Sequence, residues 1–184
     1  VGAADDLLAR ASAELFALVE GEVKGELHAR RVLAECATGR LWGIPALLRR
    51  AARDFAALRG ARDAPRVLVV GEIYVRNDPF CTGDLVGALH RRGLRAHVAP
   101  MTEYLHYSFF LDPRRGLGRS LEGWIRRRIV DACHAAAAGP MGWGGPHRVA
   151  DAVEAGATYL RPSLRGEAIL TLGSALHAWR GREV

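Results

Sequence analysis

The first part of the chain carries apolar side chains at the three- and four-residue spacing of amphipathic helices. Residues 4–38 predict two helices on this basis. A third helix is predicted to follow Gly43, because Pro45 is well tolerated in a first helical turn. These patterns bring no catalytic side chains together, so we interpret residues 1–62 as a helical packing and linking segment.

The hydrophobic period changes at residues 67–70, a short continuous apolar run bounded by Pro65 and Gly71. Such a run is typical of a strand that is buried on both faces near the centre of a parallel sheet. A helical pattern over residues 85–93 and a second strand pattern over residues 95–99 follow. Together they predict a βαβ unit with a right-handed crossover.

Helical patterns dominate the remainder of the chain. Ser120 is a predicted N-cap for a long helix, and the glycine-rich segment 139–146 is expected to end it. Helices over 149–159 and 165–179 come next, and a terminal amphipathic helix normally leads into another parallel strand. The expected fold class is therefore α/β: an incomplete Rossmann-like parallel-sheet lobe over residues 63–184, flanked by helices and preceded by the N-terminal helical segment.

Composition narrows the class of protein. Hydrophobic residues make up 49% and charged residues 25% of the chain, as in ordinary globular proteins, which argues against disordered and fibrous classes. No apolar run approaches the roughly 20 residues of a membrane-spanning helix, and the first residues lack the layout of a secretory signal. We expect a cytoplasmic protein with no membrane partner. The missing initial methionine favours an excerpt of a longer reading frame.

The formal net charge is +6, and arginine supplies nearly all the positive charge because Lys24 is the only lysine. Acidic residues lie between the arginine pairs. The sequence also lacks a predicted strand in which aromatic residues alternate with basic ones, the pattern that stacks nucleic-acid bases. We therefore interpret the arginines as solvated surface, with phosphate binding as the alternative. Nucleic acid is not an expected partner.

Two polar segments, residues 72–80 and 100–107, follow the two predicted strands. Open parallel sheets bind ligands beyond the carboxyl ends of their strands, so both segments are expected to be loops that face one crevice. The candidate catalytic residues are Glu72, Glu103 and His106, and the candidate substrate-binding residues are Tyr74, Arg76, Asn77, Tyr104 and Tyr107.

The residue types suggest the chemistry of this site. Carboxylates and a histidine can transfer protons. The guanidinium fork of Arg76 can hold a phosphate or thioester oxygen. Other interpretations remain open: Glu72 and Arg76 can pair with each other, and His106 can be an exposed loop residue. Asp78 is expected to cap the next helix, with Pro79 in its first turn.

The three cysteines, Cys36, Cys81 and Cys133, are too far apart in sequence for a metal clip or a redox dithiol. Cys81 falls in the first turn of a predicted helix, where the helix dipole favours a thiolate that can bind metal. Inert packing is the alternative for this cysteine. We expect no other metal ligand within the sequence.

Three segments in order resemble a known family. They are Val69–Phe80, Val98–Tyr107 and Tyr159–Gly173. The first reads Val-Val-Gly-Glu-Ile-Tyr-Val-Arg-Asn-Asp-Pro-Phe. Together they resemble signature segments of the 2-hydroxyacyl-CoA dehydratase and benzoyl-CoA reductase superfamily, in particular its acyl-CoA dehydratase activase-related iron–sulfur proteins.

The resemblance implies one Rossmann-like lobe of a bilobal protein that holds an iron–sulfur cluster through cysteines. It further implies low-potential electron transfer in acyl-CoA chemistry, with an acyl-CoA or related small molecule as ligand and an ATP-dependent activator protein or domain as partner. In related dehydratase subunits a cluster cysteine follows the strand equivalent to Val98-Ala99, where this chain has Met101-Thr102-Glu103-Tyr104. We therefore expect a cluster in the full-length protein, none bound by this excerpt, and no activity of the excerpt alone. The alternative function is a non-catalytic ligand-binding or regulatory α/β module.

Overall fold

The computed structural model describes residues 2–25, 28–60, 64–111, 121–143, 148–161, 163–164 and 166–181. The fold is mostly helical and contains a small two-stranded parallel sheet. The chain forms two compact units: Val1–Ala61 with Leu117–Gly145, and Arg62–Gly116 with Pro146–Val184. The long helix that follows the sheet region in sequence thus groups with the N-terminal helices. Each unit is described separately below.

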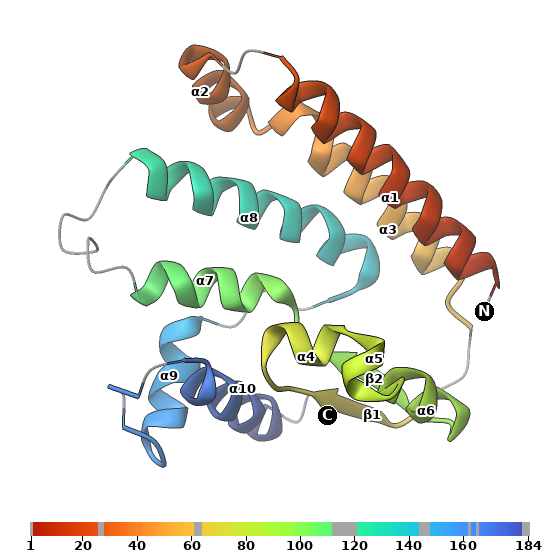
Figure 1. The fold of residues 1–184 in the computed structure, drawn as a ribbon, viewed down its shortest axis with the longest axis vertical. Helices are drawn as coiled ribbons and strands as arrows, with labels where there is room; N and C mark the ends of the chain where they lie inside the picture. Colours follow the sequence, from red (N-terminus) through yellow and green to blue (C-terminus); the bar gives the residue numbers. More distant parts are fainter. Residues whose placement is uncertain are drawn as a thin grey trace. The chain divides into compact units, whose positions relative to one another are not determined.

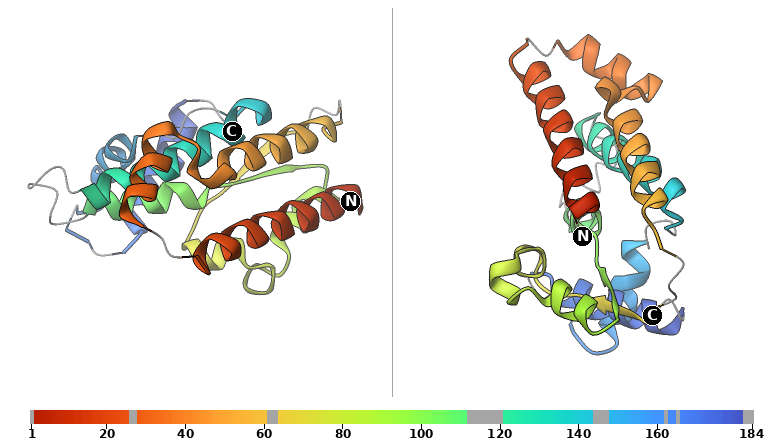
Figure 2. Two further views of the ribbon diagram at one scale, coloured as in Figure 1. Left: turned by 90° about the horizontal axis from the view of Figure 1, so that it is seen from above. Right: turned by 90° about the vertical axis from the view of Figure 1, so that its right-hand side faces the viewer.

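The first unit is built from helices that pack around α3. Its elements are α1 (Gly2–Val23), α2 (Ala29–Thr38), the short 3-10 helix η1 (Leu41–Gly43), α3 (Ile44–Ala57) and α8 (Leu121–Met141). Figure 2 shows α1 and α3 running side by side in opposite directions, and α3 also packs against α8. The three helices predicted before residue 60 are confirmed. Gly39 ends α2 in the left-handed conformation, with φ of 71°, and Pro45 occupies the first turn of α3.

Helix α8 extends further than its sequence predicts. Gly139 and Pro140 were expected to break it, but the helix continues through both to Met141. Pro140 lies in the last turn and lacks the N–H that would donate to the Ala136 carbonyl, so α8 loses one intrahelical hydrogen bond there. The end is then closed by Gly142, with φ of 63°, and by the Trp143 N–H, which donates to the Ala138 carbonyl at 3.0 Å. The predicted cap Ser120 lies outside the described residues.

The second unit contains the sheet. Strands β1 (Arg66–Val69) and β2 (Arg95–Val98) pair in parallel, with Arg66 opposite Arg95 and Val69 opposite Val98. Three short helices connect them: α4 (Ile73–Asn77), α5 (Pro79–Thr82) and α6 (Leu85–Arg91) (Figure 1). Both strands were predicted from sequence and are confirmed.

The burial of β1 differs from the prediction. A strand buried on both faces was expected, but Val69 is the one buried residue of β1, while Val67 and Leu68 are half-buried. Within the described ranges, β1 pairs with β2 alone. A continuous apolar run predicts a strand, but the number of neighbours that cover it depends on the rest of the sheet.

Helices α7 (Met101–Leu111), α9 (Val149–Ala157) and α10 (Ala168–Arg180) complete the second unit. Five of their buried residues form one cluster: Tyr107, Val149, Ala152, Ile169 and Leu170. Helices α9 and α10 cross at very short range, because a Cβ atom at Gly173 would lie 1.8 Å from the Ala152 carbonyl oxygen. In the part of the chain that the structure describes, no helix is both long and apolar enough to cross a membrane.

Candidate functional site

The carboxyl ends of β1 and β2 are joined by one buried side chain. Arg76, on α4, is only 5% exposed. Its Nη1 donates to the Gly71 carbonyl at 2.7 Å, and its Nη2 donates to the Pro100 carbonyl at 3.4 Å. Gly71 follows β1 closely and Pro100 follows β2 closely. The guanidinium therefore links the backbone leaving one strand to the backbone leaving the other.

Glu103, on α7, completes the surroundings of this guanidinium. Its Oε2 lies 3.9 Å from Nη2 of Arg76, and its Oε1 accepts a hydrogen bond from the hydroxyl of Ser174 on α10. The side chain of Glu103 is 10% exposed, so both charges are largely removed from water. A buried charge needs a charged or hydrogen-bonding partner, and here each has one.

Glu167 is the fourth member of this group, at the start of α10. One of its carboxylate oxygens, Oε2, is buried without a hydrogen-bond partner among the described residues. Burial raises the pKa of Glu167, and the negative charges of Glu72 and Glu103 raise it further. The Arg76 guanidinium and the Ile73 backbone N–H act in the opposite direction. We call Arg76, Glu103, Glu167 and Ser174 the Arg76 cluster.

Glu72 lies beside the cluster and has a structural role of its own. It is the N-cap of α4, where its Oε2 accepts the backbone N–H groups of Tyr74 at 2.9 Å and Val75 at 2.8 Å. This satisfies two donors of the first helical turn and places a negative charge at the positive end of the helix. Residues 72–80 were expected to form a loop and instead form two short helices.

The second polar segment is also helical. Residues 100–107 were expected to be a loop, but α7 begins at Met101. The side chains that α7 packs against the core are therefore spaced at helical intervals, as Tyr107 and Phe110 are. Tyr107 is buried, and its hydroxyl donates to the Gly166 carbonyl at 3.1 Å. Burial and the charge of Glu167 raise the pKa of Tyr107.

The predicted substrate-binding residues separate into buried and accessible groups. Arg76 and Tyr107 are committed to internal partners, so neither is free to hold a ligand in this conformation. Tyr74 is 73% exposed on α4. Asn77 is exposed, but its Nδ2 donates to the Ile73 carbonyl at 2.7 Å. Tyr104 is half-buried on α7.

The remaining predicted catalytic residue, His106, is half-buried on α7. Its ring meets Phe109 edge to face, with centroids 6.2 Å apart. Glu72 and Glu103 both act electrostatically on Glu167, so the two strand-end segments approach each other around the Arg76 cluster.

Sequence reasoning missed Glu167 and Ser174. Both lie on the face of α10 that also carries the buried Leu170, at positions 167, 170 and 174. Polar residues placed within a buried helical stripe are the signal that could have indicated internal partners.

The cysteines do not form a metal-binding set. Cys36 is buried on α2 and Cys133 half-buried on α8, and burial raises the pKa of both thiols. Cys81 is exposed on α5, and its thiol donates to Oδ2 of Asp78 at 3.2 Å, which raises the Cys81 pKa. Metal binding requires thiolates, so all three shifts oppose it. The described residues contain no group of three or more His, Cys, Asp or Glu side chains that could hold a metal ion, and they do not fit an iron–sulfur cluster.

The predicted helix capping next to Cys81 is confirmed. Oδ1 of Asp78 accepts the Phe80 N–H at 2.8 Å, and Pro79 occupies the first position of α5. The hydrogen bonds from the Cys81 thiol and the Phe80 N–H lower the pKa of Asp78.

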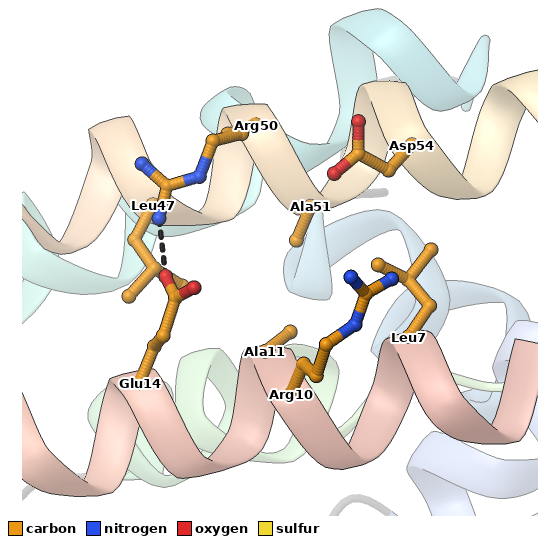
Figure 3. Close-up of a pocket in the computed structure, with 8 residues that line it drawn as sticks. All are labelled: Leu7, Arg10, Ala11, Glu14, Leu47, Arg50, Ala51 and Asp54. Carbon is orange, nitrogen blue, oxygen red and sulfur yellow. Dashed lines mark hydrogen bonds and ion pairs between the residues drawn. The ribbon is translucent and has the colours of Figure 1, made fainter.

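Two cavities lie in the first unit, and no predicted site residue lines either of them. The smaller, of about 70 Å³, separates α1 from α3, with Ala11 and Ala51 facing it and the Glu14–Arg50 ion pair at one side (Figure 3). It is too small for a substrate.

The larger cavity, of about 480 Å³, is an open groove near η1. Two of its carboxylates already have partners: Glu22 pairs with Arg31 at 2.7 Å, and Glu35 accepts the backbone N–H of Trp42 at 2.8 Å. The Arg76 cluster, in the second unit, is therefore the best-developed candidate site. No protein-family model, no curated protein sequence and no solved structure matches this chain.

Proposed function

We propose that this chain is a Rossmann-like lobe of an activase-related iron–sulfur protein of the 2-hydroxyacyl-CoA dehydratase and benzoyl-CoA reductase superfamily. Its role would be low-potential electron transfer in acyl-CoA chemistry, beside an ATP-dependent activator. One observation supports this proposal. Arg76, Glu103 and Glu167 come from the three different segments that carry the resemblance, and all three meet in one cluster.

In this proposal the Arg76 cluster holds the strand ends together, and side chains that are more exposed than Arg76 contact the ligand. Glu72 and Tyr74 are exposed at the start of α4, and Tyr104 and His106 are half-buried on α7. Glu72, Tyr74 and Tyr104 offer a carboxylate and two phenols to an acyl-CoA or to a partner, while Nε2 of His106 is buried. Arg76, the residue first expected to hold a thioester or phosphate oxygen, is instead a positioning residue.

The cysteine ligands of the cluster are proposed to come from outside these 184 residues, because Cys36, Cys81 and Cys133 are the three cysteines of the sequence and do not fit that role. The test is anaerobic purification of the protein encoded by the whole reading frame, followed by iron and acid-labile sulfide analysis. Bound iron with a brown colour is expected. Replacing all three cysteines with serine should leave the iron content unchanged. An iron-free, colourless protein would overturn the proposal.

A non-catalytic ligand-binding or regulatory module is the second candidate. It is favoured by the hydrogen bonds of Arg76 to two backbone carbonyls, because an arginine that joins two strand ends has a structural role that needs no redox reaction to explain it. This candidate predicts a whole protein that lacks iron yet binds an acyl-CoA. Calorimetric titration of the iron-free protein with acetyl-CoA tests it, with Tyr74→Ala as the variant expected to weaken binding.

A further inference from the structure

Three carboxylates lie around one arginine in the second unit. Glu72 belongs to the cap of α4, Glu103 to α7 and Glu167 to α10, and all interact electrostatically within the same small region. The only cation among the groups that act on Glu167 is Arg76. With every group ionised, the region would carry an excess of negative charge in partly buried surroundings. Such an arrangement favours retention of a proton by one carboxylate.

The hydrogen bonds identify which carboxylate holds the proton. Glu72 accepts two backbone N–H groups and is exposed to water. Glu103 contacts the Arg76 guanidinium and accepts the Ser174 hydroxyl. Both environments favour the ionised form. Glu167 also accepts the Ile73 backbone N–H, but its buried Oε2 lacks a hydrogen-bond partner among the described residues.

The position of Glu167 couples this proton to the packing of α10. Glu167 is the residue that precedes α10, next to Gly166, whose carbonyl accepts the hydroxyl of Tyr107. Within the first turn of the helix, Ile169 and Leu170 enter the buried core with Tyr107. Two turns in, Ser174 reaches Glu103. The start of α10 thus contacts α4 and α7 close to Glu167, while the helix as a whole packs chiefly against α9.

We propose that Glu167 is a proton-dependent latch: in its protonated form it lets the start of α10 pack against α4 and α7, and its ionisation loosens that packing. The groups that face it are Glu72, the Ile73 N–H and Arg76 from the α4 segment, and Glu103 and Tyr107 from α7. Ionised Glu167 meets two like charges and a desolvated oxygen, so the first turn of α10 must move toward water to relieve both. This inference does not depend on the proposed function.

The direction of the pH effect follows from linkage. Burial and the two neighbouring carboxylates raise the pKa of folded Glu167 above its value in the unfolded chain. The stabilisation is complete below the unfolded pKa of about 4.3 and is lost as pH rises through the folded pKa. Between these two values, the protection of α10 amides should fall by up to about tenfold per pH unit, because one proton is bound by the folded form alone.

Hydrogen exchange of the chain, measured from acid to mildly alkaline pH and corrected for intrinsic rates, tests the latch. The wild-type chain should lose protection in α10 as pH rises. Glu167→Gln, which mimics the protonated side chain, should keep its protection and lose this pH dependence. Glu154→Gln, a substitution of an exposed glutamate on α9, should behave as wild type. An unchanged pH dependence in Glu167→Gln would overturn the inference.

A second measurement covers the case in which Glu167→Gln does not fold. Carbon NMR of the wild-type chain, labelled at glutamate side-chain carboxyls, follows each carboxyl directly. Glu167 should titrate above the ordinary glutamate pKa of about 4.3. A Glu167 carboxyl that titrates at or below that value would contradict the latch without requiring any variant.

Discussion

Nη2 of Arg76 lies 3.9 Å from Oε2 of Glu103, and the two side chains are 3% and 10% exposed. The pair joins α4 to α7 where the two parallel strands end. Its separation is long for a direct ion pair, and Arg76 makes its shorter contact, at 2.7 Å, with the Gly71 carbonyl. The hydrogen bond of the guanidinium to the backbone therefore stabilises this region at least as much as its ion pair with Glu103 does.

Replacing this arginine should be strongly destabilising. Arg76→Met leaves Glu103 and two carbonyl oxygens without their buried donor, so we expect the free energy of unfolding to fall by about 3 kcal/mol or more. Arg91→Ala is the matched control, because Arg91 forms an exposed pair with Asp84 at 3.0 Å. That variant should lose less than about 1 kcal/mol. Urea denaturation followed by circular dichroism measures both, and equal losses would contradict the structural role of Arg76.

The cap of α4 should make a smaller contribution. Glu72→Ala removes the acceptor for two backbone N–H groups, so a loss of about 1 kcal/mol in unfolding free energy is expected. Glu154→Ala, on the exposed face of α9, should change stability by less than about 0.5 kcal/mol. Thermal denaturation of both variants distinguishes a cap from an ordinary surface carboxylate, and indistinguishable midpoints would rule the cap out.

The crossing of α9 and α10 leaves no room for a side chain at Gly173. In Gly173→Ala the new methyl group would meet the Ala152 carbonyl, so the helices must separate, at a cost of about 3 kcal/mol or more. Gly139→Ala is the contrasting variant, since nothing lies within 4 Å of a Cβ atom there. Alanine favours a helix, so this variant should gain about 0.5–1 kcal/mol. Differential scanning calorimetry tests both, and a stable Gly173→Ala protein would show the crossing to be looser.

The gap between α1 and α3 can be filled from Ala51. Ala51→Leu places methyl groups in the cavity of about 70 Å³ shown in Figure 3, and burial of this apolar surface should stabilise the first unit by about 1 kcal/mol. Ala57→Leu, at the exposed end of the same helix, should leave stability nearly unchanged. Chemical denaturation compares the two, and a destabilised Ala51→Leu protein would mean that the Glu14–Arg50 pair had been disturbed.

Cys81 should react slowly for an exposed cysteine. Its thiol donates to Asp78, which raises the Cys81 pKa and lowers the thiolate fraction at a given pH. Asp78→Asn removes the negative charge while keeping a capping oxygen, so the pH profile of alkylation by iodoacetamide should shift to lower pH. Peptide-resolved mass spectrometry separates Cys81 from buried Cys36, which is the internal control. An unshifted profile would show that Asp78 does not control the thiol.

The sequence by itself determined the local elements of this protein. Hydrophobic spacing predicted α1, α2, α3, α6, α8, α9 and α10 but not α4 or α7, a β-type run predicted β1, and Asp78-Pro79 predicted the start of α5. These features depend on side-chain periodicity and on steric preferences within a few residues, which a single sequence displays directly. The approach of the two strand-end segments also followed from local reasoning, because parallel neighbours end at the same edge of a sheet.

Only the tertiary structure decided what the polar residues do. Arg76 and Tyr107 have the residue types of a ligand site, yet their partners are backbone carbonyls supplied by other segments, and Glu167 and Ser174 join them from α10. Whether a polar side chain faces water or a buried partner depends on residues distant in sequence, and no local pattern encodes that choice.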